Sequence, residues 1–157
     1  MAKKRILIIE DEANMRHMLE VLLGKYGYEV KTAADGKEGM GAIEREQFHF
    51  ILCDIKMPRM DGMAFLKSAK KKLIDATVIM MSAYGTVDTA IEAMKLGAYD
   101  YISKPFKTDE VLLTLKKAEE REGLKQENTK LKNRIKRLTI LNDFNISLPP
   151  IFDMMKK

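Results

Sequence analysis

Five polar side chains in this 157-residue chain have the chemistry to bind a divalent cation and to receive a phosphoryl group. Glu10, Asp11 and Asp54 supply carboxylate oxygens, which are ligands for hard divalent cations. Ser82 supplies a hydroxyl and Lys104 an ammonium group, and both can contact phosphoryl oxygens. A carboxylate can also act as the nucleophile in covalent phosphoryl transfer. The set is therefore suited to metal-assisted phosphoryl chemistry if the fold brings its members together.

These residues follow short apolar runs, which predict where the fold places them. The runs cover residues 6–9, 50–53, 78–81 and 101–103. Continuous apolar runs separated by helical patterns predict buried parallel strands. The carboxyl ends of parallel strands share one edge of the sheet, where ligands bind. The five side chains are therefore expected to converge there.

Strand and helix patterns alternate five times along the chain. Strands are expected at 5–9, 28–33, 49–53, 77–81 and 99–102, and helices at 13–25, 37–47, 63–72, 87–96 and from 108. Residues 56–62 contain too much turn chemistry to be anything but a loop. This alternation predicts an α/β fold, a doubly wound five-stranded parallel sheet with right-handed crossovers.

Composition excludes several classes of protein. The net charge of +5 is divided between residues 1–118, with 19 basic and 17 acidic side chains, and residues 119–157, with 9 and 6. The basic side chains of the second part alternate with Glu, which is typical of a solvated helix face, so direct nucleic-acid binding is not expected. No signal peptide or membrane-length apolar run occurs, so a cytoplasmic protein without membrane contact is expected. The single cysteine, Cys53, is expected to be a core residue.

Several motifs in order resemble the receiver domain of bacterial two-component response regulators. They are Glu10-Asp11, Asp54 with Met57-Pro58 and Asp61-Gly62, Ser82-Ala83, and Lys104-Pro105-Phe106. The resemblance covers residues 3–118, and a receiver domain is expected over residues 1–118. It implies a flavodoxin-like fold with strand order 2-1-3-4-5, in which the strands before Asp11 and Asp54 are neighbours.

The resemblance also implies roles for these residues. Asp54 would accept a phosphoryl group from a phosphohistidine of a sensor histidine kinase. Asp11, Asp54 and the backbone carbonyl of Lys56 would bind Mg2+, and Glu10 would act directly or through water. Many receivers have Asp at the position of Glu10, so it is left open how Glu10 itself binds the metal ion. Lys104 and Ser82 would contact the phosphoryl oxygens.

A conformational switch is implied as well. The hydroxyl of Ser82 would move toward the phosphoryl group and vacate space for Tyr101, which would change the surface formed by residues 87–96, 99–102 and 108–118. Receivers usually hold the peptide bond before Pro105 in cis. Slow loss of the phosphoryl group would make the chain a self-modifying signalling switch rather than an enzyme acting on a separate substrate.

Structural explanations remain open for the same residues. Asp11 or Glu12 could simply cap the helix near 13, and Ser82 could be a polar strand end. Lys104-Pro105 could be a simple turn, and the hydroxyl of Tyr101 could lie in water. His17 and His49 lack a partner at metal-ligand spacing.

Two other function classes fit the sequence less well. Phosphohydrolases of the haloacid dehalogenase type carry a second Asp two residues after the nucleophile, where this chain has Lys56. A purely structural dimerisation module would not need Asp11, Asp54, Ser82 and Lys104 together.

Residues 119–142 predict a helical coiled-coil linker and a homodimer. Leu124, Leu131 and Leu138 recur every seven residues and fit the d positions of a heptad, which places Asn128 and Ile135 at a. A single Asn at a favours a two-stranded, parallel arrangement, and Glu127 at g then faces Lys132 at e of the partner. Gly123 weakens the helix and could form a joint with the receiver helix. The alternative is one amphipathic helix folded onto its own domain.

The last part of the chain, 143–157, is expected to be a tail. Pro149-Pro150 prevents a helix from crossing that point. A receiver followed by such a linker resembles the NtrC class of transcriptional regulators, in which the linker leads to an ATPase domain and a DNA-binding domain. No Walker A motif occurs, so the tail could be the start of a missing output domain.

Overall fold

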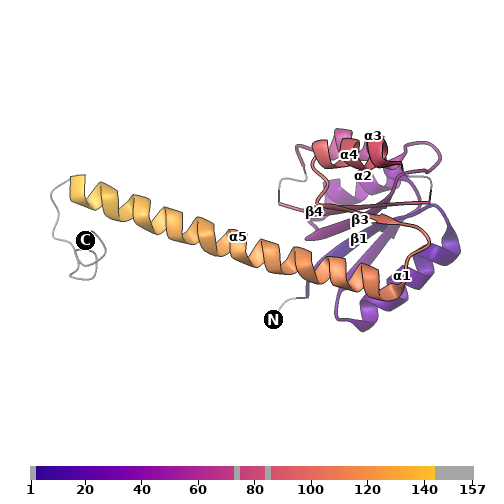
Figure 1. Cartoon of the computed structure of the whole chain (residues 1–157), viewed down its shortest axis with the longest axis horizontal. Helices are drawn as coiled ribbons and strands as arrows, with labels where there is room; N and C mark the ends of the chain where they lie inside the picture. Colours follow the sequence, from indigo (N-terminus) through magenta and orange to yellow (C-terminus); the bar gives the residue numbers. More distant parts are fainter. Residues whose placement is uncertain (1–2, 73–74, 84–85, 144–157) are drawn as a thin grey trace. The chain divides into compact units, whose positions relative to one another are not determined.

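The computed structural model describes residues 3–72, 75–83 and 86–143, and contains the expected alternation of strands and helices (Figure 1). The elements are β1 (Arg5–Ile9), α1 (Ala13–Lys25), β2 (Glu29–Ala33), α2 (Gly36–Arg45), β3 (Phe50–Asp54), α3 (Gly62–Ala69), β4 (Thr77–Ser82), α4 (Val87–Lys95), β5 (Asp100–Ser103) and α5 (Thr108–Asp143). The tail with Pro149-Pro150 lies outside the described residues.

The five strands form one parallel sheet in the order β2-β1-β3-β4-β5. The predicted flavodoxin-like topology is therefore confirmed. In the register, Ile9 lies opposite Cys53 and Ser82 opposite Ser103, so the strands end at a common edge. The residues that follow Ile9 and Cys53 must then lie side by side.

Helices cover both faces of the sheet, which explains why the strand sequences are continuously apolar. Figure 1 shows α2, α3 and α4 over one face and α1 over the other. The first turns of α5 bury Val111 and Leu115. Every residue of β3 and β4 is buried.

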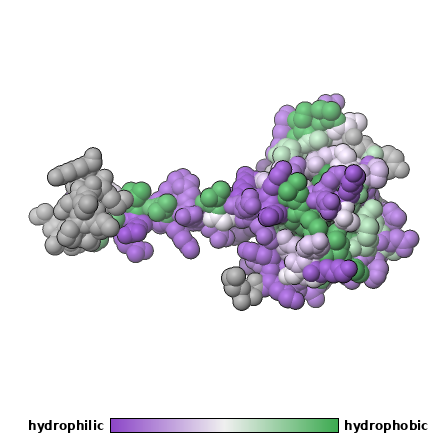
Figure 2. Space-filling view, turned by 60° about the horizontal axis from the view of Figure 1, so that its bottom comes forward, coloured by the Kyte–Doolittle hydropathy of each residue, from purple (hydrophilic) through white to green (hydrophobic). Residues whose placement is uncertain are grey.

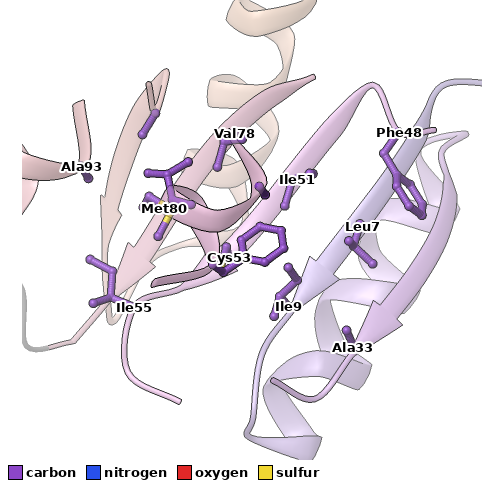
Figure 3. Close-up of a cluster of buried hydrophobic side chains, with 14 residues drawn as sticks. Leu7, Ile9, Ala33, Phe48, Ile51, Cys53, Ile55, Val78, Met80 and Ala93 are labelled. Carbon is purple, nitrogen blue, oxygen red and sulfur yellow. The ribbon is translucent and has the colours of Figure 1, made fainter. Parts of the chain in front are cut away.

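Alternate strand residues build the core on the face that α2, α3 and α4 cover. Figure 3 shows Leu7, Ile9, Ile51, Cys53 and Met80 pointing into this cluster. Because successive side chains of a strand point to opposite faces, the intervening strand residues pack on the other side of the sheet. The thiol of Cys53 is buried and free, as expected of a core residue.

The predicted boundaries agree with the observed ones to within three residues. The largest difference concerns α3, which was expected to reach residue 72 but ends at Ala69. Its buried face ends there, and the chain turns through a bond from the Lys72 N–H to the Ala69 carbonyl (2.8 Å). Helices in proteins are stabilised mainly by packing, so the following lysines do not extend the helix.

The chain consists of two compact units, Met1–Lys116 and Lys117–Lys157. The division falls inside α5, which runs without interruption from Thr108 to Asp143 and through Gly123. Among the described helices, none has both the length and the apolar composition that a membrane crossing requires.

Gly62 lies where the site end of the sheet is tightly packed. A Cβ atom at Gly62 would lie 2.2 Å from the Asp54 carbonyl oxygen, whereas a Cβ at Gly24 would meet nothing within 4 Å. We expect Gly62→Ala to lower the free energy of unfolding by about 1–3 kcal/mol. The control Gly24→Ala should be neutral or stabilising by up to about 1 kcal/mol. Urea unfolding of both variants checks this, and equal stabilities would contradict the packing argument.

Candidate functional site

The predicted carboxylates meet where β1 and β3 end. Glu10 and Asp11 directly follow β1, and Asp54 is the last residue of β3. Their ligand oxygens all lie within 4.8 Å of one another. Glu10 and Asp54 are buried, whereas Asp11 is exposed to solvent. The arrangement is that of an acidic cluster open on one side.

Lys104 is the cation of this cluster. Its Nζ atom lies 2.9 Å from Glu10 Oε2 and 3.2 Å from Asp54 Oδ2. The side chain is only 12% exposed, and the peptide bond between Lys104 and Pro105 is cis, as expected. The interpretation of Lys104-Pro105 as a simple turn therefore does not describe the contacts of this lysine.

Burial sets the electrostatics of the cluster. Loss of hydration, followed by the charge of Asp54, raises the pKa of Glu10 to about 7, although the hydrogen bond from Lys104 opposes this. Burial by itself would lower the pKa of Lys104, but its hydrogen bond to Glu10 and the charges of Glu10 and Asp54 raise it. The lysine therefore stays protonated and neutralises only part of the negative charge, which favours binding of a further cation.

Arg16 supports the backbone of the two acidic residues after β1, a role that sequence reasoning missed. Its Nη1 atom donates to the carbonyl oxygen of Glu10 (2.8 Å) and more weakly to that of Asp11 (3.4 Å). The sequence offered only an arginine in the first turns of a helix, because the contact exists only when the side chain folds back on the preceding loop. In α1 the N-cap residue is Glu12, which makes no side-chain capping bond. The carboxylate of Asp11 is therefore not the cap of this helix.

Ser82 lies on β4 and Tyr101 on the neighbouring strand β5, where Tyr101 pairs with Met80 and Ser82 with Ser103. Ser82 is 2% exposed, and the half-buried Tyr101 donates its hydroxyl to the Ser82 carbonyl oxygen at 3.5 Å. The alternative in which the Tyr101 hydroxyl lies only in water does not describe this contact. Lys56 has an exposed side chain in the loop between β3 and α3, two residues after Asp54.

The other titratable candidates lie outside this cluster. Burial, followed by the charges of Asp54 and Glu10, raises the pKa of the Cys53 thiol well above its usual range, which keeps the thiol protonated. His49 precedes β3 at its amino end and accepts a hydrogen bond from the Arg5 N–H at Nδ1 (2.9 Å). His17 is exposed on α1.

Known proteins are similar to this chain in sequence and in fold. Residues 6–116 match the family described as the response regulator receiver domain. The chain is 38% identical to the regulatory protein AtoC of Escherichia coli over 80% of its length and 27% of that protein. It is 36% identical to an NtrX-like response regulator of Rickettsia bellii over 83% of its length and 28% of that protein.

Solved structures are also similar to this chain. A CheY-like receiver domain of Methanospirillum hungatei superimposes with a TM-score of 0.76 at 32% identity, covering 79% of this chain and 99% of that one. NtrX of Brucella abortus gives a TM-score of 0.77 at 35% identity, covering 83% of this chain and 30% of that one.

This chain spans about a quarter of the length of curated relatives such as AtoC and the NtrX-like regulator. They include response regulators of the NtrC class, which confirms the resemblance expected of the linker. The family match covers the sheet except for Arg5, the first residue of β1, and includes all three carboxylates of the acidic cluster. The chain belongs to the family of response regulator receiver domains.

Proposed function

We propose that this chain is a phosphorylation-controlled switch that accepts a phosphoryl group on Asp54 from a sensor histidine kinase. The observation that carries the proposal is the position of the Asp54 carboxylate, at the open edge of the sheet, beside Glu10 and within 3.2 Å of Lys104. An Asp54 oxygen attacks phosphorus, and the bond from phosphorus to the imidazole nitrogen of the kinase breaks. The electron pair of that bond stays on the imidazole.

The donor set fits Mg2+, which prefers oxygen ligands and keeps several waters. Glu10, Asp11 and Asp54 would hold the ion through their carboxylates, together with the backbone carbonyl of Lys56. When bound, Mg2+ screens the negative charge that a phosphoryl group brings to the carboxylates. The exposure of Asp11 leaves room for water ligands on the open side.

The chain's own polar groups then hold the acyl phosphate. Lys104 lies within hydrogen-bond distance of Asp54. When Asp54 carries a phosphoryl group, the ammonium group of Lys104 can instead contact a phosphoryl oxygen. The hydroxyl of Ser82, at the adjacent strand end, donates to another. Hydrolysis of the acyl phosphate by water would reset the switch.

The contact between Tyr101 and Ser82 supports a packing response to phosphorylation. If the segment of Ser82 moves toward the phosphoryl group, the weak bond to the Tyr101 hydroxyl breaks and the ring can turn inward. The phosphoryl group needs only to bind the second conformation more tightly to shift the population. The surface affected includes β5 and α4, and Val87, Ile91 and Met94 of α4 are exposed.

A hydrolase is a weaker alternative, because Lys56 occupies the position where the haloacid dehalogenase type has its second Asp. We further propose a cytoplasmic location and control of a transcriptional output. This output is argued from relatives such as the transcriptional regulatory protein ZraR of Escherichia coli, which is 39% identical over 72% of this chain and 26% of that protein. The NtrC-class linker supports the same output.

The second part of the proposal is a dimer formed through the exposed half of α5. Leu124, Leu131 and Ile135 are 67%, 52% and 54% exposed. Figure 2 shows hydrophobic side chains at intervals among hydrophilic ones along this helix. A regular apolar stripe on an exposed helix is expected to be covered by a partner.

Charges at the flanks of the stripe favour a parallel pair. In the heptad with Leu131 at d, the g residues Glu120 and Glu127 face the e residues Lys125 and Lys132 of the partner. An antiparallel pair centred on the same heptad would instead bring Glu127 against Glu127. Residues 119–142 are thus proposed as a parallel two-stranded linker.

The phosphoacceptor is tested by Asp54→Asn. This variant should take up no phosphoryl group from acetyl phosphate, because an amide is not a nucleophile, and intact-protein mass measurement shows this directly. The control is Asp61→Asn, which changes an exposed N-cap carboxylate into a residue that caps equally well. Labelling of Asp54→Asn at the wild-type level would refute the assignment.

Metal binding should depend on pH through Glu10. Because the pKa of Glu10 is raised to about 7, its carboxylate is protonated below that pH and must release a proton to bind Mg2+. The affinity for Mg2+ should therefore rise roughly tenfold from pH 6 to pH 8. Calorimetry in two buffers of different ionisation enthalpy measures both the affinity and the released proton. Glu10→Gln should remove this pH dependence, and its persistence would place the titrating group elsewhere.

The dimer is tested by sedimentation of Leu131→Ala/Leu138→Ala. Each truncation should weaken the pair by on the order of 2 kcal/mol per chain, enough together to give monomers at micromolar concentration. The control Ile140→Ala truncates an exposed residue at an f position outside the seam and should stay dimeric. A dimer that survives removal of residues 119–157 would place the interface on the receiver, and a wild-type monomer would mean that the stripe packs within its own chain.

A further inference from the structure

Asp35 is a buried carboxylate outside the acidic cluster. It follows β2, is 1% exposed, and caps α2 by accepting the Glu38 N–H at Oδ1 (2.9 Å). Its second oxygen forms an ion pair with the guanidinium of Arg59. A buried carboxylate needs such partners to remain charged. The hydrogen bond from the Glu38 backbone, opposed by burial but helped by the charge of Arg59, lowers the pKa of Asp35.

Arg59 approaches from the loop that follows Asp54, and its backbone conformation is unusual. Its φ angle is +63°, in the left-handed region that glycine adopts freely and other residues rarely do. Its side chain is 63% exposed, so packing does not explain an arginine here. From this backbone position the Arg59 side chain forms the ion pair with Asp35.

A backbone contact lies beside the ion pair. The Gly36 N–H donates to the Met60 carbonyl oxygen (3.0 Å), and a Cβ atom at Gly36 would lie 2.6 Å from that same oxygen. The tip of the loop is therefore held against the start of α2 by one side-chain and one backbone interaction. The two interactions are adjacent, because Asp35 directly precedes Gly36 in the chain and Arg59 directly precedes Met60.

The base of the same loop is fixed to the sheet. The Ile55 N–H donates to the Met81 carbonyl oxygen (2.9 Å), and the Gly62 N–H donates to the Ile55 carbonyl oxygen (2.8 Å). Lys56 lies between this base and the tip. It is one residue from Ile55 and three residues from Arg59.

We propose that Asp35 and Arg59 are positioning residues, whose ion pair holds the loop so that the backbone carbonyl of Lys56 is directed at the metal position. The inference rests on the proposed Mg2+ site and adds residues that touch neither the metal nor the phosphoryl group. Groups that orient metal ligands in this way commonly change metal affinity by about 10–100-fold when removed.

Arg59→Gly distinguishes positioning from simple electrostatics. Removal of a cation near the site would by charge alone strengthen Mg2+ binding, whereas loss of the ion pair should weaken it, by about tenfold at pH 8. Glycine also accepts the left-handed backbone, so the variant keeps the loop conformation accessible. The matched control is Lys37→Ala, which removes an exposed cation two residues from Asp35 without touching the ion pair.

Two further variants complete the test. Asp35→Asn keeps an oxygen that can accept the Glu38 N–H but loses the charge, and it should weaken Mg2+ binding as Arg59→Gly does. Because the two residues act as one pair, the double variant should be no weaker than either single variant. Arg59→Lys should restore part of the affinity. In the metal-free protein, hydrogen exchange at the Gly36 amide should be faster in Arg59→Gly and unchanged in Lys37→Ala.

The outcomes separate this inference from the proposed function. Wild-type Mg2+ affinity in Arg59→Gly, or additive losses in the double variant, would overturn the positioning role while leaving the metal site intact. A wild-type protein that binds no Mg2+ would instead overturn the metal site and, with it, this inference. Weakened binding with faster Gly36 exchange in Arg59→Gly, absent from Lys37→Ala, supports the positioning role.

Discussion

The site depends on one interaction, the contact of Lys104 with two buried carboxylates. Strand register places Glu10 beside Asp54, and burial then makes the proximity of like charges unfavourable. Lys104 lies within 2.9 Å of Glu10 and 3.2 Å of Asp54 and offsets this in part. Because one ammonium group faces three carboxylates, the edge keeps an affinity for a further positive charge, which a proton on Glu10 or a metal ion can supply.

Several contacts hold the backbone around these charges. Arg16 binds the carbonyl oxygens of Glu10 and Asp11, and Gly62 lies against the carbonyl of Asp54 too closely for any side chain. The loop after Asp54 is bound at its base to β4 and at its tip to α2. The fold thus places the three carboxylates together, which is the preorganisation that the proposed metal-assisted phosphoryl chemistry would need.

Helix α5 belongs to both units and has a different apolar surface in each. Its first turns bury Val111 and Leu115 in the receiver, whereas Leu124, Leu131 and Ile135 in the second unit are exposed. The apolar residues in the first turns of α5 therefore pack within the chain, whereas those farther along have the heptad spacing of a helix pair. Continuity through Gly123 means that no break in the helix separates these surfaces, although glycine lowers the local helix propensity.

Much of the fold could be predicted from the sequence, because apolar runs, turn residues and helical periodicity are local properties. They located every strand and helix to within three residues, and the motifs around Asp54 and Lys104 identified the family and its strand order. The contacts that define the site were beyond such reasoning. Lys104 and Glu10 are 94 residues apart, and the partners of Arg16, Asp35 and Arg59 depend on how a side chain folds back or how two loops meet. The sequence determined which chemical groups stand at the strand ends; only the tertiary structure decided which of them touch, because strand register and loop packing, not spacing along the chain, set those distances.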